Sequence, residues 1–392
     1  MKIVMLTSRF PYPLEKGDKL RAYHQLRTLS KLHEVHLITI ADFNVSKQEM
    51  EALRPIVASL HVLKINPLTR LISLLKAVFQ KTPFQIAFFY NEQAALYIKT
   101  TIESIRPDHI YCQLVRMTPY VIGLEQAKTI DYMDAFGIGM LRRAGVVNKL
   151  LQIFYKYEAK RMICYEKESY KHFANHVIIS EQDRNQIALS HEKEIHVVPN
   201  GIEEKFFEHI DIPPQYDIAF VGNMGYLPNI EAAEFLVNSL LPLLETGTTV
   251  ILAGARPHMR VKKLASEKVK VTGWVDDIRT AYHSAKIFVA PIWSGTGQQN
   301  KILEAMACGL PCITTTSVNN AIGAEKDNHI MIADDVIQMA DAVNILKNNK
   351  TLRTRLSKEG QHFVKQNYSW EHYSRVLSDI FAGRINKKAD AD

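Results

Sequence analysis

Two charged residues with helical spacing follow a glycine-containing loop in the second half of the chain. Lys301 and Glu304 are three residues apart, so on a helix their side chains share one face. Gly295 and Gly297 precede them and allow the backbone to approach a ligand closely. The free N–H groups at the start of a helix attract anions. We therefore expect Lys301 to meet a phosphate and Glu304 to accept hydrogen bonds from a ribose.

The same pair has a simpler interpretation, namely a surface salt bridge on a capped helix that ends at Gly309. A Walker phosphate-binding loop is excluded by the flanking residues. That motif requires glycine at the position of Asn300, and it requires serine or threonine at the position of Ile302. Spacing alone leaves the ligand site and the salt bridge as alternatives.

Short apolar runs alternate with longer helical segments along the whole chain. The runs are apolar on both faces, which is typical of strands that are covered by helices on both sides. Alternation of strands and helices predicts parallel sheets with right-handed crossovers. The predicted strands are 3–7, 35–40, 61–65, 109–115, 129–133, 176–180, 195–199, 217–222, 248–254, 269–275, 286–292, 312–316 and 329–334.

Two such series meet near residues 197–207, where a Pro-Asn-Gly sequence indicates a turn. The sequence therefore predicts an α/β protein with two doubly wound, Rossmann-like domains that face each other across a cleft. The first comprises residues 1–198 together with a C-terminal helix over about 371–392, and the second comprises residues 199–370. Ligands of such sheets bind beyond the carboxyl ends of the strands.

The chain has 392 residues, of which 47% are apolar and 23% are charged. This is the balance of a soluble globular protein, and it excludes a disordered chain and a disulfide-stapled miniprotein. Four scattered cysteines, Cys112, Cys164, Cys308 and Cys312, fit a reducing compartment. No apolar run reaches the ~18 residues of a membrane span, and no secretory signal is evident. We expect a cytoplasmic protein.

The net charge of +7 is unevenly distributed along the chain. Residues 1–200 carry 27 Lys and Arg against 19 Asp and Glu, whereas residues 201–392 carry 21 against 22. A basic half can meet an anionic membrane or a phosphate-rich ligand, or it can simply keep the protein soluble. No nucleic-acid-binding motif is present, so no nucleic acid is expected.

Segments 68–81 and 147–162 of this basic half mix apolar residues with Lys and Arg. One interpretation is a basic amphipathic surface that rests on anionic lipid, at the inner face of the cytoplasmic membrane. The other is a pair of ordinary core-facing helices with a solvated basic rim.

The run EAMACGLP (304–311), between a glycine loop and a threonine-rich strand, resembles the donor-site signature of family 4 glycosyltransferases. Residues 9–29, 197–207 and 367–377 resemble that family's first glycine loop and helix, its interdomain entry and its closing segment. The resemblance covers nearly the whole chain and is nearest to the sugar transferases of exopolysaccharide gene clusters. It implies the GT-B fold, a nucleotide diphosphate sugar as donor, and retention of configuration.

The resemblance also implies roles for single residues. Glu304 takes the position that binds the donor ribose, and Thr296 stands where the family usually has a second glutamate. The loop 222–229 lacks the basic residues of many members, which leaves the diphosphate to Lys301, the helix terminus and Arg256. The predicted donor contacts are Gly17, Asn223, Gly225, Arg256, Trp274, Val275, Gly295, Thr296, Gly297, Gln298, Lys301 and Glu304.

Asp131 and Asp134 lie at the end of a predicted strand. They either touch a sugar or cap the following helix, and Asp134 joins Lys301 as a predicted catalytic residue. No cluster of His, Cys and Asp has metal-ligand spacing, so neither a metal nor another cofactor is expected. Cys308 and Cys312 are expected to be core residues.

The predicted function is a retaining hexosyltransferase of polysaccharide biosynthesis. It would move a hexose from a UDP- or GDP-sugar to a hydroxyl of a glycan or of a lipid-linked acceptor. In the mechanism usually proposed for this family, the leaving phosphate itself takes the proton of the acceptor, so no base is named. The alternative is a glycosyltransferase-like scaffold that binds a nucleotide sugar without turnover.

Overall fold

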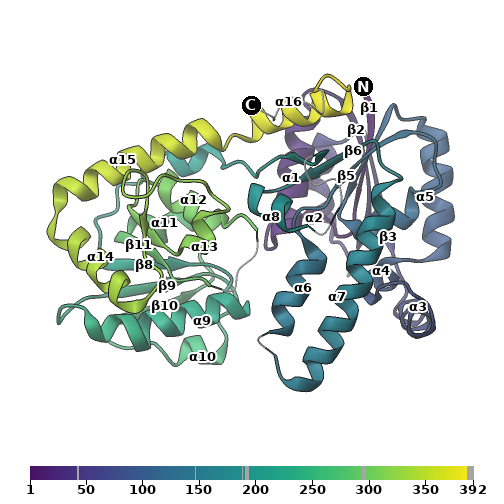
Figure 1. The fold of residues 1–392 in the computed structure, drawn as a ribbon. Helices are drawn as coiled ribbons and strands as arrows, with labels where there is room; N and C mark the ends of the chain where they lie inside the picture. Colours follow the sequence, from purple (N-terminus) through teal and green to yellow (C-terminus); the bar gives the residue numbers. More distant parts are fainter. Residues whose placement is uncertain (42–43, 146, 188, 190–193, 294–296, 386–392) are drawn as a thin grey trace. The chain divides into compact units, whose positions relative to one another are not determined.

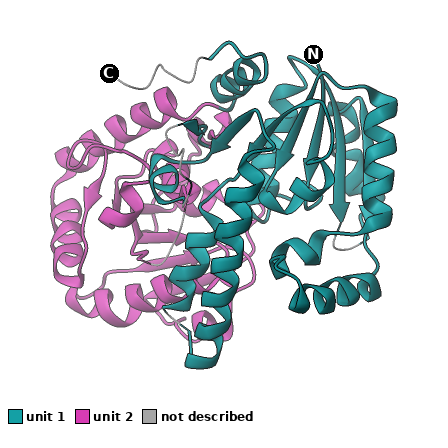
Figure 2. Ribbon diagram, turned by 45° about the vertical axis from the view of Figure 1, so that its right-hand side comes forward, with its two compact units in different colours: residues 1–199, 370–392 teal, residues 200–369 magenta. Residues whose placement is uncertain are grey.

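The protein divides into two compact units in a computed structural model that describes residues 1–41, 44–145, 147–187, 189, 194–293 and 297–385. Unit 1 comprises Met1–Pro199 and Trp370–Asp392, and unit 2 comprises Asn200–Ser369 (Figure 2). Each unit is a parallel sheet with helices on both faces (Figure 1). The predicted fold class, α/β with two doubly wound domains, is confirmed.

The sheet of unit 1 has seven strands in the order β3-β2-β1-β4-β5-β6-β7, all of them parallel. Its inner strand β1 is buried almost throughout, as expected of a strand that helices cover on both faces. Every strand predicted for this half is present. The strands are β1 (Lys2–Thr7), β2 (Glu34–Ala41), β3 (Ser59–Lys64), β4 (His109–Gln113), β5 (Ala127–Asp131), β6 (Asn175–Ile178) and β7 (His196–Val197).

The last helix, α16 (Trp370–Phe381), returns the chain to unit 1 and packs on α1 (Gly17–Leu29). The imidazole of His24 stacks on the indole of Trp370 with a centroid distance of 4.8 Å, and Thr28 hydrogen-bonds to Ser374. The other α-helices of unit 1 are α2 (Lys47–Glu51), α3 (Pro67–Phe79), α4 (Phe84–Phe89), α5 (Glu92–Ile105), α6 (Phe136–Ala144), α7 (Lys149–Tyr170) and α8 (Glu181–Gln186), and short 3-10 turns are η1 (Arg54–Ile56) and η2 (Val115–Tyr120).

The sheet of unit 2 has six parallel strands in the order β10-β9-β8-β11-β12-β13. All were predicted from apolar runs. They are β8 (Tyr216–Val221), β9 (Val250–Ala253), β10 (Val269–Gly273), β11 (Ala285–Ala290), β12 (Cys312–Thr314) and β13 (Met331–Ile332). The helices are α9 (Leu227–Phe235), α10 (Met259–Lys262), α11 (Arg279–His283), α12 (Asn300–Ala307), α13 (Thr316–Asn319), α14 (Val336–Asn348) and α15 (Lys350–Asn367), with short helical turns η4 (Glu204–Phe207), η5 (Leu236–Leu240) and η6 (Leu241–Leu243).

Because the strands are parallel, the loops that follow them gather at the carboxyl edge of each sheet. In unit 2 the loops after β10, β9, β8 and β11 follow four neighbouring strands, and they carry the predicted donor residues of this half. In unit 1, Gly17 follows β1 and Asp134 follows β5. Among the helices within the described ranges, none combines the length and hydrophobicity that spanning a bilayer requires.

Candidate functional site

The carboxyl edge of the sheet in unit 2 is built from closely packed backbone. Gly254 directly follows β9 with φ +134°, and a Cβ added there would lie 1.9 Å from the carbonyl oxygen of Gly222. The same two loops, which follow β8 and β9, meet again further along, since a Cβ on Gly225 would lie 3.1 Å from the carbonyl oxygen of Arg256. Only glycine fits at residue 254, so the backbones of these two loops pack directly against each other next to the side chain of Lys301.

Lys301 extends from the first turn of α12 towards the loop after β8. Its ammonium donates to Oδ1 of Asn229 and lies 5.3 Å from the ring centroid of Phe220. Asn229 is buried and is itself held by a 2.9 Å hydrogen bond from Nδ2 to the carbonyl oxygen of Asn223. Burial lowers the pKa of Lys301 to about 8, and the nearby Glu304 carboxylate opposes that shift. The site thus holds a poorly solvated cation that a bound anion would stabilise.

Glu304 has a different partner one helical turn further along α12. The hydroxyl of Tyr282, a buried residue of α11, lies 2.8 Å from Oε2 of Glu304 and 3.2 Å from the carbonyl oxygen of Lys301. Burial raises the pKa of Glu304, while the hydrogen bond from Tyr282 opposes the rise. Lys301 and Glu304 therefore each have a neutral partner of their own, and the interpretation as a simple surface salt bridge is wrong.

The end of α12 is as predicted from the sequence. Gly309 adopts a left-handed conformation with φ +77°. Its N–H donates to the carbonyl of Met306, and the N–H of Leu310 donates to the carbonyl of Ala305, which together form a Schellman motif. Cys308 and Cys312 flank this turn as buried free thiols in the core.

The side-chain amide of Gln298 forms two hydrogen bonds with the backbone of Asn200. Its Oε1 accepts a 2.8 Å hydrogen bond from the N–H of Asn200, and its Nε2 donates to the carbonyl oxygen of Asn200 at 3.0 Å. The amide thus ties the loop before α12 to the segment that enters unit 2. If Gln298 contacts a donor, as predicted, only its main chain is available for that contact while this amide is bonded to Asn200. Gly297 has φ +71°, and Gly295 and Thr296 lie outside the described residues.

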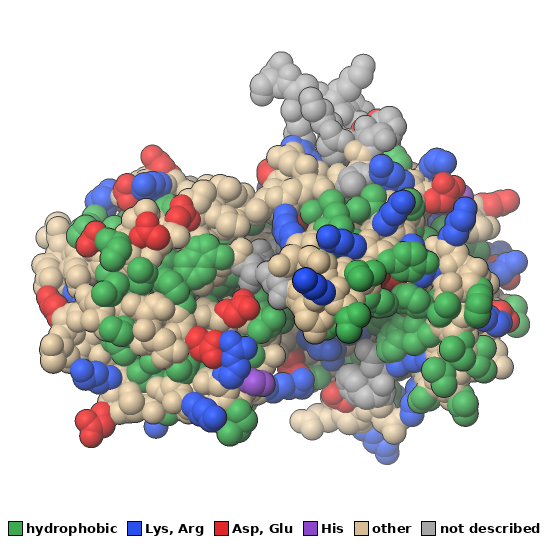
Figure 3. Space-filling view, turned by 60° about the horizontal axis from the view of Figure 1, so that its bottom comes forward, with side chains coloured by type: hydrophobic (Ala, Val, Ile, Leu, Met, Phe, Trp, Pro, Cys, Tyr) green, Lys and Arg blue, Asp and Glu red, His purple; other side chains and the backbone are tan. Residues whose placement is uncertain are grey.

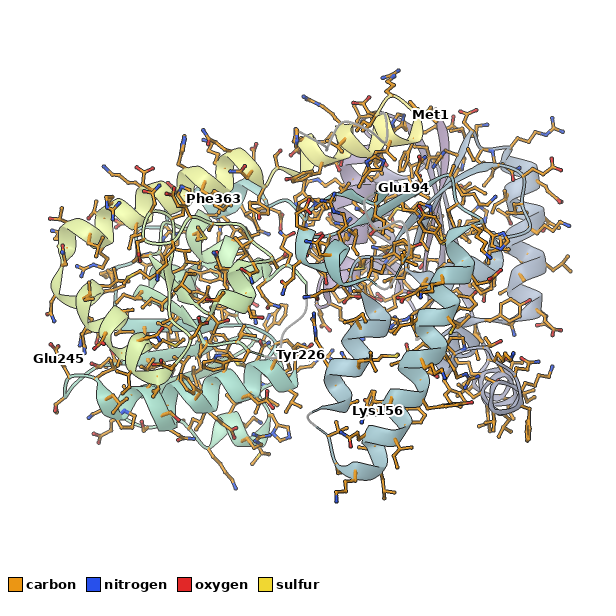
Figure 4. The ribbon with its side chains drawn as sticks, viewed as in Figure 1. Met1, Lys156, Glu194, Tyr226, Glu245 and Phe363 are labelled. Carbon is orange, nitrogen blue, oxygen red and sulfur yellow. The ribbon has the colours of Figure 1, made fainter. Side chains whose placement is uncertain are left out.

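The neighbouring loops add exposed side chains to this edge. Trp274, directly after β10, is 65% exposed and donates from Nε1 to Asp276 at 3.2 Å. Val275 is half-buried and packs on the core, whereas Arg256 is exposed with φ +54°. Tyr226, labelled in Figure 4, is exposed just before α9.

In unit 1 the two predicted site residues also lie at the carboxyl edge of the sheet. Gly17 is exposed at the start of α1, and a Cβ built on it meets no atom within 4 Å. Asp134 is half-buried between β5 and α6, and burial raises its pKa to about 6. The carboxylate of Asp183 adds to this rise and the guanidinium of Arg116 opposes it.

The neighbouring carboxylate, Asp131, has a structural role instead. It is fully buried and accepts hydrogen bonds from Nε of Arg21 at 2.7 Å and from the hydroxyl of Tyr111 at 2.6 Å. Its second oxygen accepts from the N–H of Met133 at 2.9 Å. The prediction that Asp131 touches a sugar is wrong, because both of its oxygens are used inside the core. Capping of α6 is wrong as well, since its N-cap, Ala135, has no side-chain cap.

The sequence interpretation missed Asn229 and Tyr282, which hold the two charged side chains. Asn229 lies in the first turn of α9, at the end of the segment 222–229 that the sequence analysis had singled out, so a local signal existed. Tyr282 had none, because it lies on a different helix, 22 residues before Glu304. Over the described ranges, no group of three or more His, Cys, Asp or Glu side chains is arranged to hold a metal ion.

Residues 215–349 match the family model described as glycosyl transferases group 1. One relative is the UDP-Gal:alpha-D-GlcNAc-diphosphoundecaprenol alpha-1,3-galactosyltransferase of Escherichia coli, which is 24% identical over 66% of this chain and 70% of its own length. Another is an uncharacterised 44.6 kDa protein in the cps region of Klebsiella pneumoniae, which is 20% identical over 97% of this chain and 99% of its own.

Solved structures of other proteins match nearly the whole chain, and two of them serve as examples. A sucrose-phosphate synthase from Thermosynechococcus elongatus aligns with a TM-score of 0.72 at 14% identity, over 98% of this chain and 99% of that one. Anabaena HepE in complex with UDP aligns with a TM-score of 0.68 at 13% identity, over 98% and 100% of the two chains. The chain therefore has the GT-B fold, and residues 215–349 within it are similar to the glycosyl transferases of group 1.

Proposed function

We propose that the protein is a retaining hexosyltransferase that takes its sugar from a UDP- or GDP-hexose bound at the start of α12. The observation that carries the proposal is that a poorly solvated Lys301 ammonium and a buried Glu304 carboxyl group lie one helical turn apart at the carboxyl edge of the sheet in unit 2. A nucleotide sugar offers the matching groups, namely a diphosphate and ribose hydroxyls. Solved structures of the fold neighbour HepE with UDP and with UDP-glucose support this choice of ligand class.

Lys301 and the N–H groups at the start of α12 would stabilise the departing diphosphate by positive charge that is already in place. Glu304, positioned by Tyr282, would accept hydrogen bonds from the ribose. Trp274 and Val275 would lie along the base, and the main chain of Gly297 and Gln298 would approach the sugar.

In this proposal the bond between the anomeric carbon and the diphosphate oxygen breaks, and a bond to the acceptor oxygen forms on the same face. The acceptor proton passes to the leaving phosphate, so no residue is assigned as the base. Asp134, whose pKa of about 6 lies near neutrality, is the proposed contact from unit 1 to the reacting sugar or the acceptor. The Escherichia coli relative is named for transfer to a diphosphoundecaprenol-linked sugar, which supports a lipid-linked acceptor here.

The test is incubation with a panel of UDP- and GDP-hexoses in the presence and absence of lipid-linked sugar acceptors. We expect nucleotide release that depends on one donor and an α-linked product from an α-linked donor, read by NMR. An inverted product would contradict retention. Tight nucleotide-sugar binding without turnover across the panel would instead support the non-catalytic scaffold.

A further inference from the structure

Helix α3 presents its apolar side to solvent, which is the reverse of an ordinary surface helix. Only Ala77 of this helix is buried. The side chain of Phe79 is 91% exposed and that of Leu75 is 57% exposed. Together with Leu68, Leu71, Ile72 and Val78 they occupy one continuous arc at helical spacing, and all six are exposed.

The side of α3 that faces the protein carries the buried Ala77 and the half-buried Thr69 and Ser73. Thr69 and Ser73 line a cavity of about 480 Å³ together with Asn91 and Glu92, and the exposed Ile72 and Lys76 also line it. Most of the large apolar side chains of the helix therefore lie on its outward side. This contradicts the interpretation of segment 68–81 as a core-facing helix, and it leaves the apolar side without a covering layer among the described residues.

The first half of α7 extends this surface. Phe154 stacks on Phe84, which follows α3, with a centroid distance of 5.8 Å. Arg161 donates to the carbonyl oxygens of Ala77 and Gln80 at 2.5 Å and 2.6 Å, so this face of α7 adjoins the end of α3. The exposed apolar residues of the same face are Leu150, Ile153, Phe154 and Tyr157.

The charges around these helices are almost all positive. No Asp or Glu occurs between Glu51 and Glu92, a stretch that contains all of α3. Between Arg142 and Ile163 the only acidic residue is Glu158, which is buried. Figure 3 shows hydrophobic side chains gathered over unit 1 with lysine and arginine side chains among them. The exposed lysines are Lys76, Lys81, Lys149, Lys156 and Lys160, and Figure 4 labels Lys156 on α7.

We infer that these faces of α3 and α7 dock the protein on an anionic lipid bilayer. The apolar side chains would enter the boundary between headgroups and acyl chains, and the lysines would lie against lipid phosphates. A second copy of the chain fits less well, since a symmetric contact through this face would bring like charges together. The inference rests on exposure and charge and does not require the proposed sugar chemistry, although a lipid-linked acceptor would lie in the same membrane.

The experiment is flotation of the full chain with phosphatidylcholine vesicles that contain or lack phosphatidylglycerol. We expect binding to the anionic vesicles, and we expect added salt to weaken it because the lysine contribution is screened. The double variant Leu75→Asp/Phe79→Asp should lower the bound fraction about tenfold or more. Its folding should be unchanged, because both side chains are exposed; far-UV circular dichroism checks this.

The matched control is Ile337→Asp, which places a carboxylate on a 59% exposed apolar position of α14 in unit 2 and should leave flotation unchanged. A second measurement does not depend on loss of binding. The variant Phe79→Trp should gain fluorescence at shorter wavelength with anionic vesicles and should be quenched by brominated lipid, whereas Ile337→Trp should show neither effect.

Three results would overturn the inference. One is absence of flotation with anionic vesicles at low salt, and another is equal binding to vesicles without phosphatidylglycerol. The third is dissociation of a dimer by Leu75→Asp/Phe79→Asp in sedimentation without any change in flotation. None of these measurements includes a donor sugar, so failure here and failure of the proposed transferase activity remain distinguishable.

Discussion

At the scale of single residues, the site in unit 2 depends on two charged groups that neutral side chains hold in place. Asn229 accepts from Lys301, and Tyr282 donates to Glu304. Burial shifts both pKa values towards the uncharged forms. A group that is costly to charge in the free protein gains most when a ligand supplies the missing partner.

The pKa of Lys301 gives a prediction for the pH dependence of binding. Its value of about 8 in the free protein means that the ammonium is charged at pH 7 and is progressively lost above pH 8. Because a diphosphate binds the charged form, UDP affinity should be nearly constant below about pH 7.5 and fall towards pH 9.5. Titration calorimetry of UDP and of uridine, which lacks the phosphates, measures the effect. A ratio of the two affinities that does not change with pH would contradict the phosphate role.

The ribose role of Glu304 is tested by removing either side of the contact. Glu304→Ala should weaken UDP binding by about 2 kcal/mol, since hydrogen bonds to a charged group are lost. The variant should also bind UDP and its 2′,3′-dideoxy analogue equally, whereas the natural protein should favour UDP. Glu267→Ala, at an exposed position outside the strands and helices of unit 2, serves as the control and should retain that preference. A preserved preference in Glu304→Ala would assign the ribose to another group.

At the scale of elements, the edge of the sheet in unit 2 depends on a close approach of two strand ends. Gly254→Ala would place a methyl group 1.9 Å from the carbonyl oxygen of Gly222 at a positive φ. The substitution should destabilise unit 2 by about 3 kcal/mol or more, since backbone must move to relieve the clash. Scanning calorimetry measures the loss.

The control for this clash is Gly247→Ala, where φ is also positive at +99° but nothing lies within 4 Å of the added methyl group. It should cost only about 1 kcal/mol, which is the strain alone. Equal losses in the two variants would show that conformational strain, and not the contact between β8 and β9, makes glycine necessary at residue 254.

At the scale of the whole molecule, the chain leaves unit 1 after Pro199 and returns to it at Trp370. Unit 2 is therefore continuous in sequence, whereas unit 1 is completed only by α16. Leu377, Ile380 and Phe381 of that helix are buried in the core cluster formed with α1 and the sheet. A substitution that weakens the packing of this C-terminal helix should accordingly lower the stability of unit 1, which contains the N-terminus.

Leu377→Ala tests this assignment. Removing a fully buried leucine should destabilise unit 1 by about 2–5 kcal/mol and lower its unfolding transition. If UDP binds unit 2, it should raise the other transition, and calorimetry with and without UDP then tells the two apart. Ile337→Ala, at an exposed position, should shift neither. A shift of the UDP-sensitive transition in Leu377→Ala would contradict the division of the chain.

Local sequence patterns by themselves determined the strands, their parallel arrangement and the end of α12. Strands buried on both faces need continuous apolar runs, and helix ends need particular residues such as Gly309, so both leave a signal within a few residues. These features are local, and they could be predicted. The resemblance of the 304–311 run to a donor-site signature added Glu304 as a ribose contact, and that role stays a prediction.

Only the tertiary structure decided which groups surround the charged residues and which helix faces stay uncovered. Asp131 accepts a hydrogen bond from Arg21, which lies 110 residues away in the sequence, and Glu304 accepts one from Tyr282 on another helix. Hydrophobic periodicity shows that α3 has an apolar side, but the same pattern fits a side that faces the core and one that faces outward. Whether the apolar side of α3 faces the core or the solvent depends on which segments, distant in sequence, pack around the helix, and only the tertiary structure shows this.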